Sequence, residues 1–464
     1  MSLTELSTAI PERLPAQLNF ADLGTQFQAV TGKRSVHIQP SSGNTFSPDG
    51  IRVIRFNVTG EGYIVPETFR LQASFTVTAG SHAYKPCAPM SCLFERVRVI
   101  SSGQVLSDES YFDRLQSLHH EWMDKDTFKE LCAESFYCDV DKNGKATFSD
   151  VAAGSQVRIQ MPFVTTPIFA SNKKLIPIRY CPLVIEMQLQ PIYHSMNDVT
   201  GLSNPDNYPK WTLSDINCLC DVLHLDPALD NLLQERHRTD KIPLKMREWH
   251  TMKQAVTENA TEFTLQLLKG MTRLCSVCVT FEGPNEDRDA YPQKATPATA
   301  TAPRFEADEK YKKTLNLYFP PGNREEFQWW IQIGTERTPV YPVRGMREAR
   351  MRARQGLCHG PLSRQAYKGD LIRFGGVNGS SGQIAGRGFF ALIDTEKICG
   401  SPGGLVGTHH GVATDLTGEN TQGGKTIYAF FQELVTTYGI TAAYMHVQYV
   451  KIVNLSSAGV EVEE

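Results

Sequence analysis

The sequence predicts an all-β protein made of two similar domains in tandem, each with one helix inserted at a corresponding point. A strand–turn–helix pattern runs from Phe94 to Trp122, and a second copy begins 233 residues later, at Phe327. Solenoids and propellers repeat every ~20–50 residues, so a period this long indicates duplicated domains. A chain of 464 residues also has room for two domains of ~100–200 residues, each with its own core.

The first half begins with a polar, irregular segment, residues 1–34, which we expect to form an N-terminal arm. Six segments then have the composition and alternation of strands: Ile51–Val58, Thr68–Thr78, Leu93–Ile100, Gln156–Phe163, Leu175–Leu189 and Ile216–Leu225. In the first copy of the repeated pattern, a Ser102-Gly103 turn leads through a short strand to a helix over Tyr111–Trp122. A short helix over Asp226–His237, with Asp226 as its N-cap, marks the connection between the domains.

The second half shows the same kind of pattern. Its predicted strands are Glu262–Leu268, Arg273–Phe281, Thr314–Phe319, Phe327–Gly334, Gly386–Asp394, Thr426–Gln432 and Tyr444–Asn454. In the second copy of the repeat, a proline-punctuated turn separates the strand that begins at Phe327 from a helix over Val343–Leu357. Residues 282–310 predict an exposed loop, and 17 of the 35 glycines fall in Gly356–Gly424, which predicts further loops there. Short strands, many turns and few helices are typical of β-sandwiches and jelly rolls.

Charge and hydropathy exclude several classes of protein. The net charge is −3, so the chain lacks the excess of Lys and Arg that wrapping nucleic acid requires. Residues 1–14 have no basic segment followed by an apolar one, so no signal peptide is predicted. No apolar run approaches the ~18 residues of a membrane span. We therefore expect a soluble protein that is intracellular when made.

The eleven cysteines are odd in number and follow no framework spacing, so reduced thiols are expected. Cys275 and Cys278 form a C-x-x-C pair, but residues three apart on a strand point to opposite faces and cannot hold one ion. Cys218 and Cys220 can share a face but have no second pair at a zinc-site spacing. Buried structural thiols, without a metal or cofactor, are the prediction.

A calcium loop was weighed for Asp139–Asp150. Asp139, Asp141 and Asn143 supply oxygen ligands at alternate positions, and Gly144 stands at the sixth. The twelfth position is Asp150 instead of a bidentate Glu, and a strand follows where a calcium loop needs a helix. We favour the alternative, a turn on Asn143-Gly144 between two short strands.

Three other motifs fail as sites. Gly418–Thr426 approximates a phosphate-binding loop, but Glu419 replaces a required Gly and a strand follows in place of a helix. Gly386-Arg-Gly388 runs directly into a strand, so it is not a dinucleotide fingerprint. Adjacent histidines cannot both face one ion, so both pairs are expected to be structural or exposed: His119-His120 and His409-His410. No catalytic constellation stands out, and an enzyme is not predicted.

The predicted helix Val343–Leu357 is rich in arginine. Its arginines are Arg344, Arg347, Arg350, Arg352 and Arg354. A basic helix can contact nucleic acid or an acidic neighbour. The alternative is a solvated or inter-subunit face, and we favour it because no aromatic platform for bases accompanies the arginines.

Six segments, taken in order from about residue 50 onward, together form a recognisable series: Leu93–Leu115, Leu175–Pro191, Trp211–Asp226, Trp329–Pro342, Phe389–Thr408 and Ala442–Val462. In this series the chain resembles the double jelly-roll major capsid proteins of double-stranded DNA viruses, in particular those of polinton-like viruses, virophages and polintons. Each segment alone is weak, but their order and spacing together are specific.

The resemblance implies two eight-stranded jelly rolls, over residues 35–236 and 237–464, and a purely structural function. It implies a homotrimer that forms a pseudo-hexameric capsomer, and neighbouring capsomers that tile an icosahedral shell around the genome. The implied partners are other copies of the chain, penton or vertex proteins, minor cement proteins and a membrane or genome beneath the shell, with no small-molecule substrate. The chain would be made in the host cytoplasm and reside in the virion.

Two other functions share this strand content. A cytosolic two-domain β-sandwich that binds or cleaves carbohydrate would need a pocket with converging carboxylates or stacking aromatic rings. A minor viral component, such as a spike or vertex protein, would resemble the family with one jelly roll, so the doubled pattern disfavours it. The capsid interpretation predicts trimers that bury several thousand Å² between subunits.

Overall fold

The computed structural model describes most of the first half of the chain and slightly less than half of the second. The described residues are 30–79, 83–122, 125–140, 146–170, 174–191, 195, 210–239, 241–257, 260–271, 273–282, 318–319, 328–356, 386–387, 390–395, 426–432, 442–456 and 459–463. The loop predicted at 282–310 and the phosphate-loop motif therefore lie almost wholly outside them. None of the helices in these ranges is long and apolar enough to cross a membrane.

The first domain consists of two antiparallel sheets. In one sheet, β13 (Trp211–Leu225) pairs on one side with β1 (Val30–Ile38) and β2 (Thr45–Phe46). On its other side it pairs with β5 (Arg70–Val77), which pairs in turn with β10 (Gln156–Pro162). The facing sheet has the order β3 (Val53–Val58), β12 (Leu183–Leu189), β6 (Phe94–Ser101) and β7 (Gln104–Ser110). Additional strands are β4 (Tyr63–Ile64), β11 (Ile176–Pro177) and a separate hairpin of β8 (Cys138–Val140) and β9 (Ala146–Phe148).

The second domain repeats this arrangement. Its β23 (Ala442–Ser456) lies between β14 (Ile242–Ala255) on one edge and β16 (Leu274–Glu282), then β21 (Ala391–Asp394), on the other. The facing sheet has the order β15 (Phe263–Leu267), β22 (Ile427–Gln432), β18 (Gln328–Ile333) and β19 (Glu336–Arg344). Additional strands are β17 (Tyr318–Phe319), β20 (Gly386–Arg387) and β24 (Gly459–Glu463).

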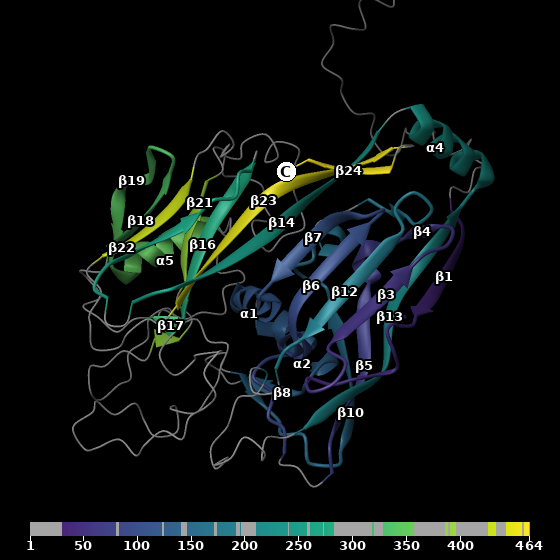
Figure 1. The fold of residues 1–464 in the computed structure, drawn as a ribbon, viewed down its shortest axis with the longest axis horizontal. Coiled ribbons are helices and arrows are strands. Elements are labelled where there is room, and N and C mark those ends of the chain that lie inside the picture. Colours follow the sequence, from purple (N-terminus) through teal and green to yellow (C-terminus); the bar gives the residue numbers. More distant parts are fainter. Residues whose placement is uncertain are drawn as a thin grey trace, which may run out of the picture.

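The two halves therefore have the same strand order in both sheets, and each is an eight-stranded jelly roll. In chain order, β1 and β2 correspond to β14, β13 to β23, and β7 to β19. No sheet of the described chain contains strands from both halves. Figure 1 shows the two domains side by side along the longest axis of the molecule. The prediction of a duplicated, all-β chain is confirmed.

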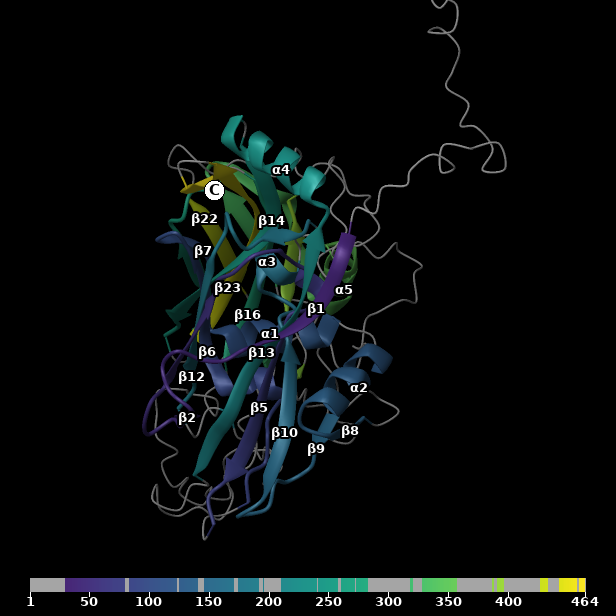
Figure 2. The same ribbon diagram turned by 90° about the vertical axis from the view of Figure 1, so that its right-hand side faces the viewer.

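Five helices accompany the strands in the described ranges. They are α1 (Phe112–Trp122), α2 (Lys125–Glu134), α3 (Pro167–Ala170), α4 (Pro227–Thr239) and α5 (Gly345–Gly356), with short 3-10 turns at Pro66–Thr68 and Met90–Leu93. The helix α4 begins as predicted, because the Asp226 carboxylate accepts a hydrogen bond from the Ala228 amide at 3.0 Å. In Figure 2, α2 and the β8–β9 hairpin lie together at one side of the first domain.

The repeated pattern is more regular than the sequence predicted. The predicted proline-punctuated turn before α5 is wrong, because residues 336–344 form the strand β19 and pair with β18. Both copies are therefore strand, strand, helix: β6–β7–α1 and β18–β19–α5. Each helix is preceded or opened by a residue with positive φ, Tyr111 at 54° and Gly345 at 65°. The helix predicted over Val343–Leu357 begins two residues later in the structure, at Gly345, because Val343 and Arg344 are the last residues of β19.

Other boundaries also differ from the prediction. The segment 175–189 divides into β11 and β12, and the segment 386–394 divides into β20 and β21. The segment 68–78 begins in a 3-10 turn. Strand structure starts at Val30, inside the predicted arm of residues 1–34. Besides β1 and β19, six described helices and strands were not predicted: β2, β4, β14, β24, α2 and α3.

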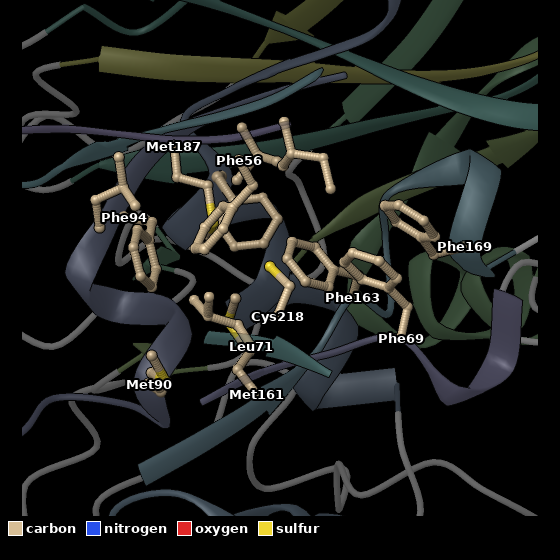
Figure 3. Packing of buried hydrophobic residues seen from close by; sticks show 14 of the residues in the cluster. Phe56, Phe69, Leu71, Met90, Phe94, Met161, Phe163, Phe169, Met187 and Cys218 are labelled. Atoms are coloured by element: carbon tan, nitrogen blue, oxygen red, sulfur yellow. The ribbon is translucent and has the colours of Figure 1, made fainter. Parts of the chain in front are cut away.

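The first jelly roll is closed by an aromatic and sulfur-rich core between its sheets. Phe69 stacks on Phe169 with ring centroids 4.0 Å apart, and Phe163 lies 5.5 Å from both (Figure 3). Phe69 and Phe163 flank β5 and β10 and Phe169 belongs to α3, so the rings fasten the short helix to the sheet edge. Cys218, fully buried on β13, points into the same core.

Candidate assembly site at the junction of the two domains

Where the structure describes them, the motifs that the sequence suggested as candidate sites lie in a hairpin, in strands and in helices. The described flanks of the candidate calcium loop, β8 and β9, pair as a hairpin, which confirms the two short strands of the favoured interpretation. The turn itself, residues 141–145, lies outside the described residues. In the described part of the chain, no group of three or more His, Cys, Asp or Glu side chains is placed to hold a metal ion.

The cysteine pairs are buried, as predicted. Cys275 and Cys278 lie on β16 and are 1% and 0% exposed, and Cys218 and Cys220 on β13 are 0% and 3% exposed. Burial raises the pKa of the Cys218 and Cys278 thiols well above their usual value and that of Cys220 to about 11. Such thiols are neutral and unreactive, which is the behaviour of small core hydrophobes.

The histidine and arginine candidates belong to two helices. His119 and His120 are both buried on α1. Arg352 of α5 lies 3.6 Å from Glu348, one turn earlier, and donates to the Tyr341 hydroxyl at 2.9 Å. The side chains of the arginines at 347, 350 and 354 and the second histidine pair, at 409 and 410, lie outside the described residues.

The helix α1 contributes side chains to both hydrophobic cores. Phe112 packs in the core of the first domain, whereas Leu115, Leu118 and Trp122, at helical spacing, pack in the core of the second. Trp122 is completely buried. Its ring lies 5.6 Å from that of Trp249 on β14 and 5.8 Å from that of Phe390 beside β21. The helix thus inserts one domain into the other.

Strands of the second domain also contribute side chains to the core of the first. Five of its buried side chains belong to the core cluster of the first domain: Leu244, Met246, Val453, Leu455 and Val460. They come from β14, β23 and β24, and of these strands β14 and β24 contact β7 of the first domain. Each fully buried aliphatic side chain contributes ~1.5–3 kcal/mol relative to an exposed one. The two domains are therefore packed against each other through buried side chains of both.

A buried ion pair lies at the centre of this junction. Glu248 on β14 and Lys451 on β23 are 3% and 2% exposed, and their charged atoms lie 2.7 Å apart. Glu248 also accepts a hydrogen bond from the Tyr449 hydroxyl at 3.0 Å and one from the Asp108 backbone amide of β7 at 3.2 Å. The last bond crosses between the domains. Removing one partner of a buried pair leaves an uncompensated charge, which costs ~3–5 kcal/mol.

Arg114 of α1 makes a second polar contact across the junction. Its guanidinium is nearly fully buried, donates to the Phe281 carbonyl at 3.0 Å and lies 4.6 Å from the centre of the Tyr444 ring. Phe281 and Tyr444 belong to the second domain. Beside them, His446 bridges Thr251 and Thr280 at 2.9 and 3.1 Å. Burial, followed by the charge of Arg114, lowers the pKa of His446 to about 3, so the imidazole is neutral.

Glu109, on β7, is the titratable group of the junction. Its Oε2 accepts hydrogen bonds from Thr165 and Thr166 at 3.1 and 3.0 Å. Burial is the main cause that raises the pKa of Glu109 to about 8; Glu248 and Asp108 raise it further, and the two threonine bonds oppose the rise. A neutral carboxyl group at this position costs much less than a buried carboxylate.

The junction was not found from the sequence. Its signal is the run Arg247-Glu248-Trp249-His250, in which three consecutive residues are buried and the alternation of a half-exposed strand fails. Such a strand is covered on both faces, one by its own core and one by the neighbouring domain. The arrangement can hold two jelly rolls in one fixed orientation through buried apolar contacts and a few buried polar ones.

Comparison with known proteins agrees with this architecture. No family model matches the sequence, and no curated protein matches it. Among solved structures, VP54 of the virus PBCV-1, as fitted into a reconstruction of the virophage Sputnik, matches with a TM-score of 0.58, 11% identity and coverage of 93% of this chain and 96% of that one.

Two further solved structures match over nearly their whole length. The Faustovirus major capsid protein has a TM-score of 0.53 and 8% identity, with 98% of this chain and 94% of that chain covered. The mavirus major capsid protein has a TM-score of 0.51 and 13% identity, with 98% and 95% covered. The chain shares its fold, two jelly rolls in tandem, with these proteins.

Proposed function

We propose that this chain, which has the fold of viral major capsid proteins, is itself a major capsid protein. The observation that carries the proposal is the likeness of the whole two-domain chain to the Faustovirus and mavirus major capsid proteins, each over 98% of its length. A match of that extent includes both domains and their junction. A single jelly roll is a fold with many functions, whereas a rigid pair of them is a much narrower architecture.

The geometry suits a subunit of a symmetric shell. Three copies of a chain with two similar domains present six similar domains around a threefold axis, which is the capsomer that we propose. The interfaces of such a ring are heterologous, and the ring closes only if the domains of each subunit keep a fixed angle. The junction built on α1, Glu248 and Arg114 supports that requirement.

The further partners are proposed from the same architecture. Capsomers would contact one another along an icosahedral facet, penton and minor cement proteins would occupy vertices and seams, and the virion would enclose a double-stranded DNA genome. The arm predicted over residues 1–34 is described only from Val30, where β1 begins, and the residues before Val30 would reach beneath the shell toward a neighbouring capsomer, the genome or an internal membrane. The domain limits proposed here remain 35–236 and 237–464, with the connection over α4.

Size-exclusion chromatography with multi-angle light scattering tests the proposal. The chain mass is 51.8 kDa, and we expect a particle of three times that mass that survives dilution. Negative-stain microscopy should show trimers with a hexagonal outline. A monomer at all accessible concentrations would refute the proposal, and a monomer that binds glycans would favour the carbohydrate-binding alternative.

A further inference from the structure

The strands that meet at the junction have counterparts at the outer edges of the two domains. Within the chain, the β7 edge of the first domain contacts β14, which is the edge strand of the second. In strand order β7 corresponds to β19, and β14 corresponds to β1 with β2. In the described chain, β19 pairs only with β18 and β1 only with β13. Figure 1 shows β19 and β1 at opposite ends of the long axis.

The exposed apolar side chains gather on these same two edges. Nine large hydrophobic side chains are exposed in the part of the chain that the structure describes, and six of them lie there. On β19 and α5 they are Val340, Tyr341 and Met351, which are 84%, 57% and 44% exposed. On or beside β1 and β3 they are Val30, Ile51 and Val53, which are 37%, 52% and 48% exposed. The strands β1 and β3 contact each other, so the second set forms one edge of the first domain.

The shape of β19 differs from that of β7 where these residues lie. The β18–β19 register shifts between Trp329 and Ile331, which face Val343 and Thr338, so β19 carries extra residues around Val340 and Tyr341. This bulge projects its apolar side chains away from the domain. Among the described charged residues near the bulge, Arg337 lies 4.5 Å from the Trp330 ring centre, and Arg352 pairs with Glu348. The side chains of Val340 and Tyr341 are therefore exposed beside charged groups that already have partners within the face.

We propose that the β19–α5 face of one copy binds the β1–β3 edge of a second copy, in the way that the β7–α1 face binds the β14 edge within the chain. The occupant is a second copy because the internal duplication already supplies one example of the contact. The two faces lie on one chain and differ from each other, so the contact is head-to-tail and closes into a ring. This inference rests on the proposed capsid function and names the surfaces that make its trimer.

Two double variants and a control test the surfaces. Val340→Asp with Tyr341→Asp disrupts the first face, Val30→Asp with Ile51→Asp disrupts the second, and Leu232→Asp changes an equally exposed apolar residue of α4. Each residue is exposed, so circular dichroism and melting of the monomer should stay as in the wild type. Two carboxylates at the centre of an interface should raise the concentration needed for trimers at least ~100-fold. The Leu232→Asp protein should form trimers as the wild type does.

Mixing the two double variants distinguishes a head-to-tail contact from any other. Each variant keeps one intact face, and the intact faces are complementary, so an equimolar mixture should give a one-to-one dimer of about twice the chain mass that cannot close. Trimers of either double variant at the wild-type concentration would overturn this inference while leaving the capsid function standing. A mixture without dimers would also overturn it. A wild-type chain that is always monomeric would overturn the proposed function itself.

Discussion

Replacing Trp122 by Ala measures how far α1 is shared between the two cores. The side chain is fully buried and lies among rings of the second domain, although it belongs to a helix of the first. Large-to-small changes of a buried Trp cost ~3–5 kcal/mol, because the cavity collapses only in part. The Leu232→Ala change, at a side chain that is 62% exposed, is the matched control and should cost little.

The size of the thermal shift reports the size of the unfolding unit. At ~2.1 cal/mol/K per residue, unfolding all 464 residues as one unit converts 3–5 kcal/mol into a drop in Tm of ~3–5 °C. Unfolding of the second domain alone, about half of the chain, would give a drop of ~6–10 °C. Because α1 joins both cores, we expect one calorimetric transition and the smaller shift.

Differential scanning calorimetry at one fixed protein concentration is the assay, since the Tm of an oligomer depends on concentration. Two resolved transitions, of which the Trp122→Ala change moves only one, would refute the shared core. A shift no larger than that of Leu232→Ala would refute the burial of Trp122 at the junction.

Three further predictions concern polar groups and backbone. Burial raises the pKa of Glu109 to about 8, above its value in the unfolded chain, so the folded state binds an additional proton between these two pKa values. The free energy of unfolding should therefore fall as the pH rises from about 5 to 8, by at most ~1.4 kcal/mol per pH unit. In the Glu109→Gln variant, the Tm measured as a function of pH should lose most of this slope. The Lys451→Met change leaves Glu248 as an unpaired buried charge and should lower the free energy of unfolding by ~3–5 kcal/mol. Adding Glu248→Gln should restore part of this stability. A double-mutant cycle measured by chemical denaturation that shows no coupling energy would contradict the pairing. Gly345→Ala places a side chain at φ 65° and should cost ~1–2 kcal/mol, while an unchanged unfolding midpoint would exclude left-handed backbone at the start of α5.

The sequence predicted what depends on local pattern. The duplication, the strands with clean alternation such as Leu183–Leu189, and the Asp226 cap of α4 follow from spacing within a few residues. It missed β14, because burial on both faces removes the alternation on which the prediction depends. It also missed β19, where Pro339 and Pro342 resemble a turn although an edge strand with a bulge tolerates proline.

The junction was invisible for a different reason. Arg114, Glu109 and Glu248 resemble ordinary surface charges in the sequence, and only the fold brings them together. Contacts between residues separated by more than a hundred positions leave no short-range spacing to detect. The capsid resemblance entered through the order of weak segments, which records the arrangement of strands and carries no information on the charges between the domains.

The dual membership of α1 has a consequence for how such a chain can be altered. A break in the gene near α4 would leave the N-terminal fragment with Leu115, Leu118 and Trp122 facing water, and the C-terminal fragment with an empty slot lined by Trp249 and Phe390. Exposed apolar surface of that kind favours aggregation. We expect neither fragment to be recovered alone in soluble form, and we expect recombinants that exchange one half between distant relatives to be nonviable unless the helix and its slot travel together.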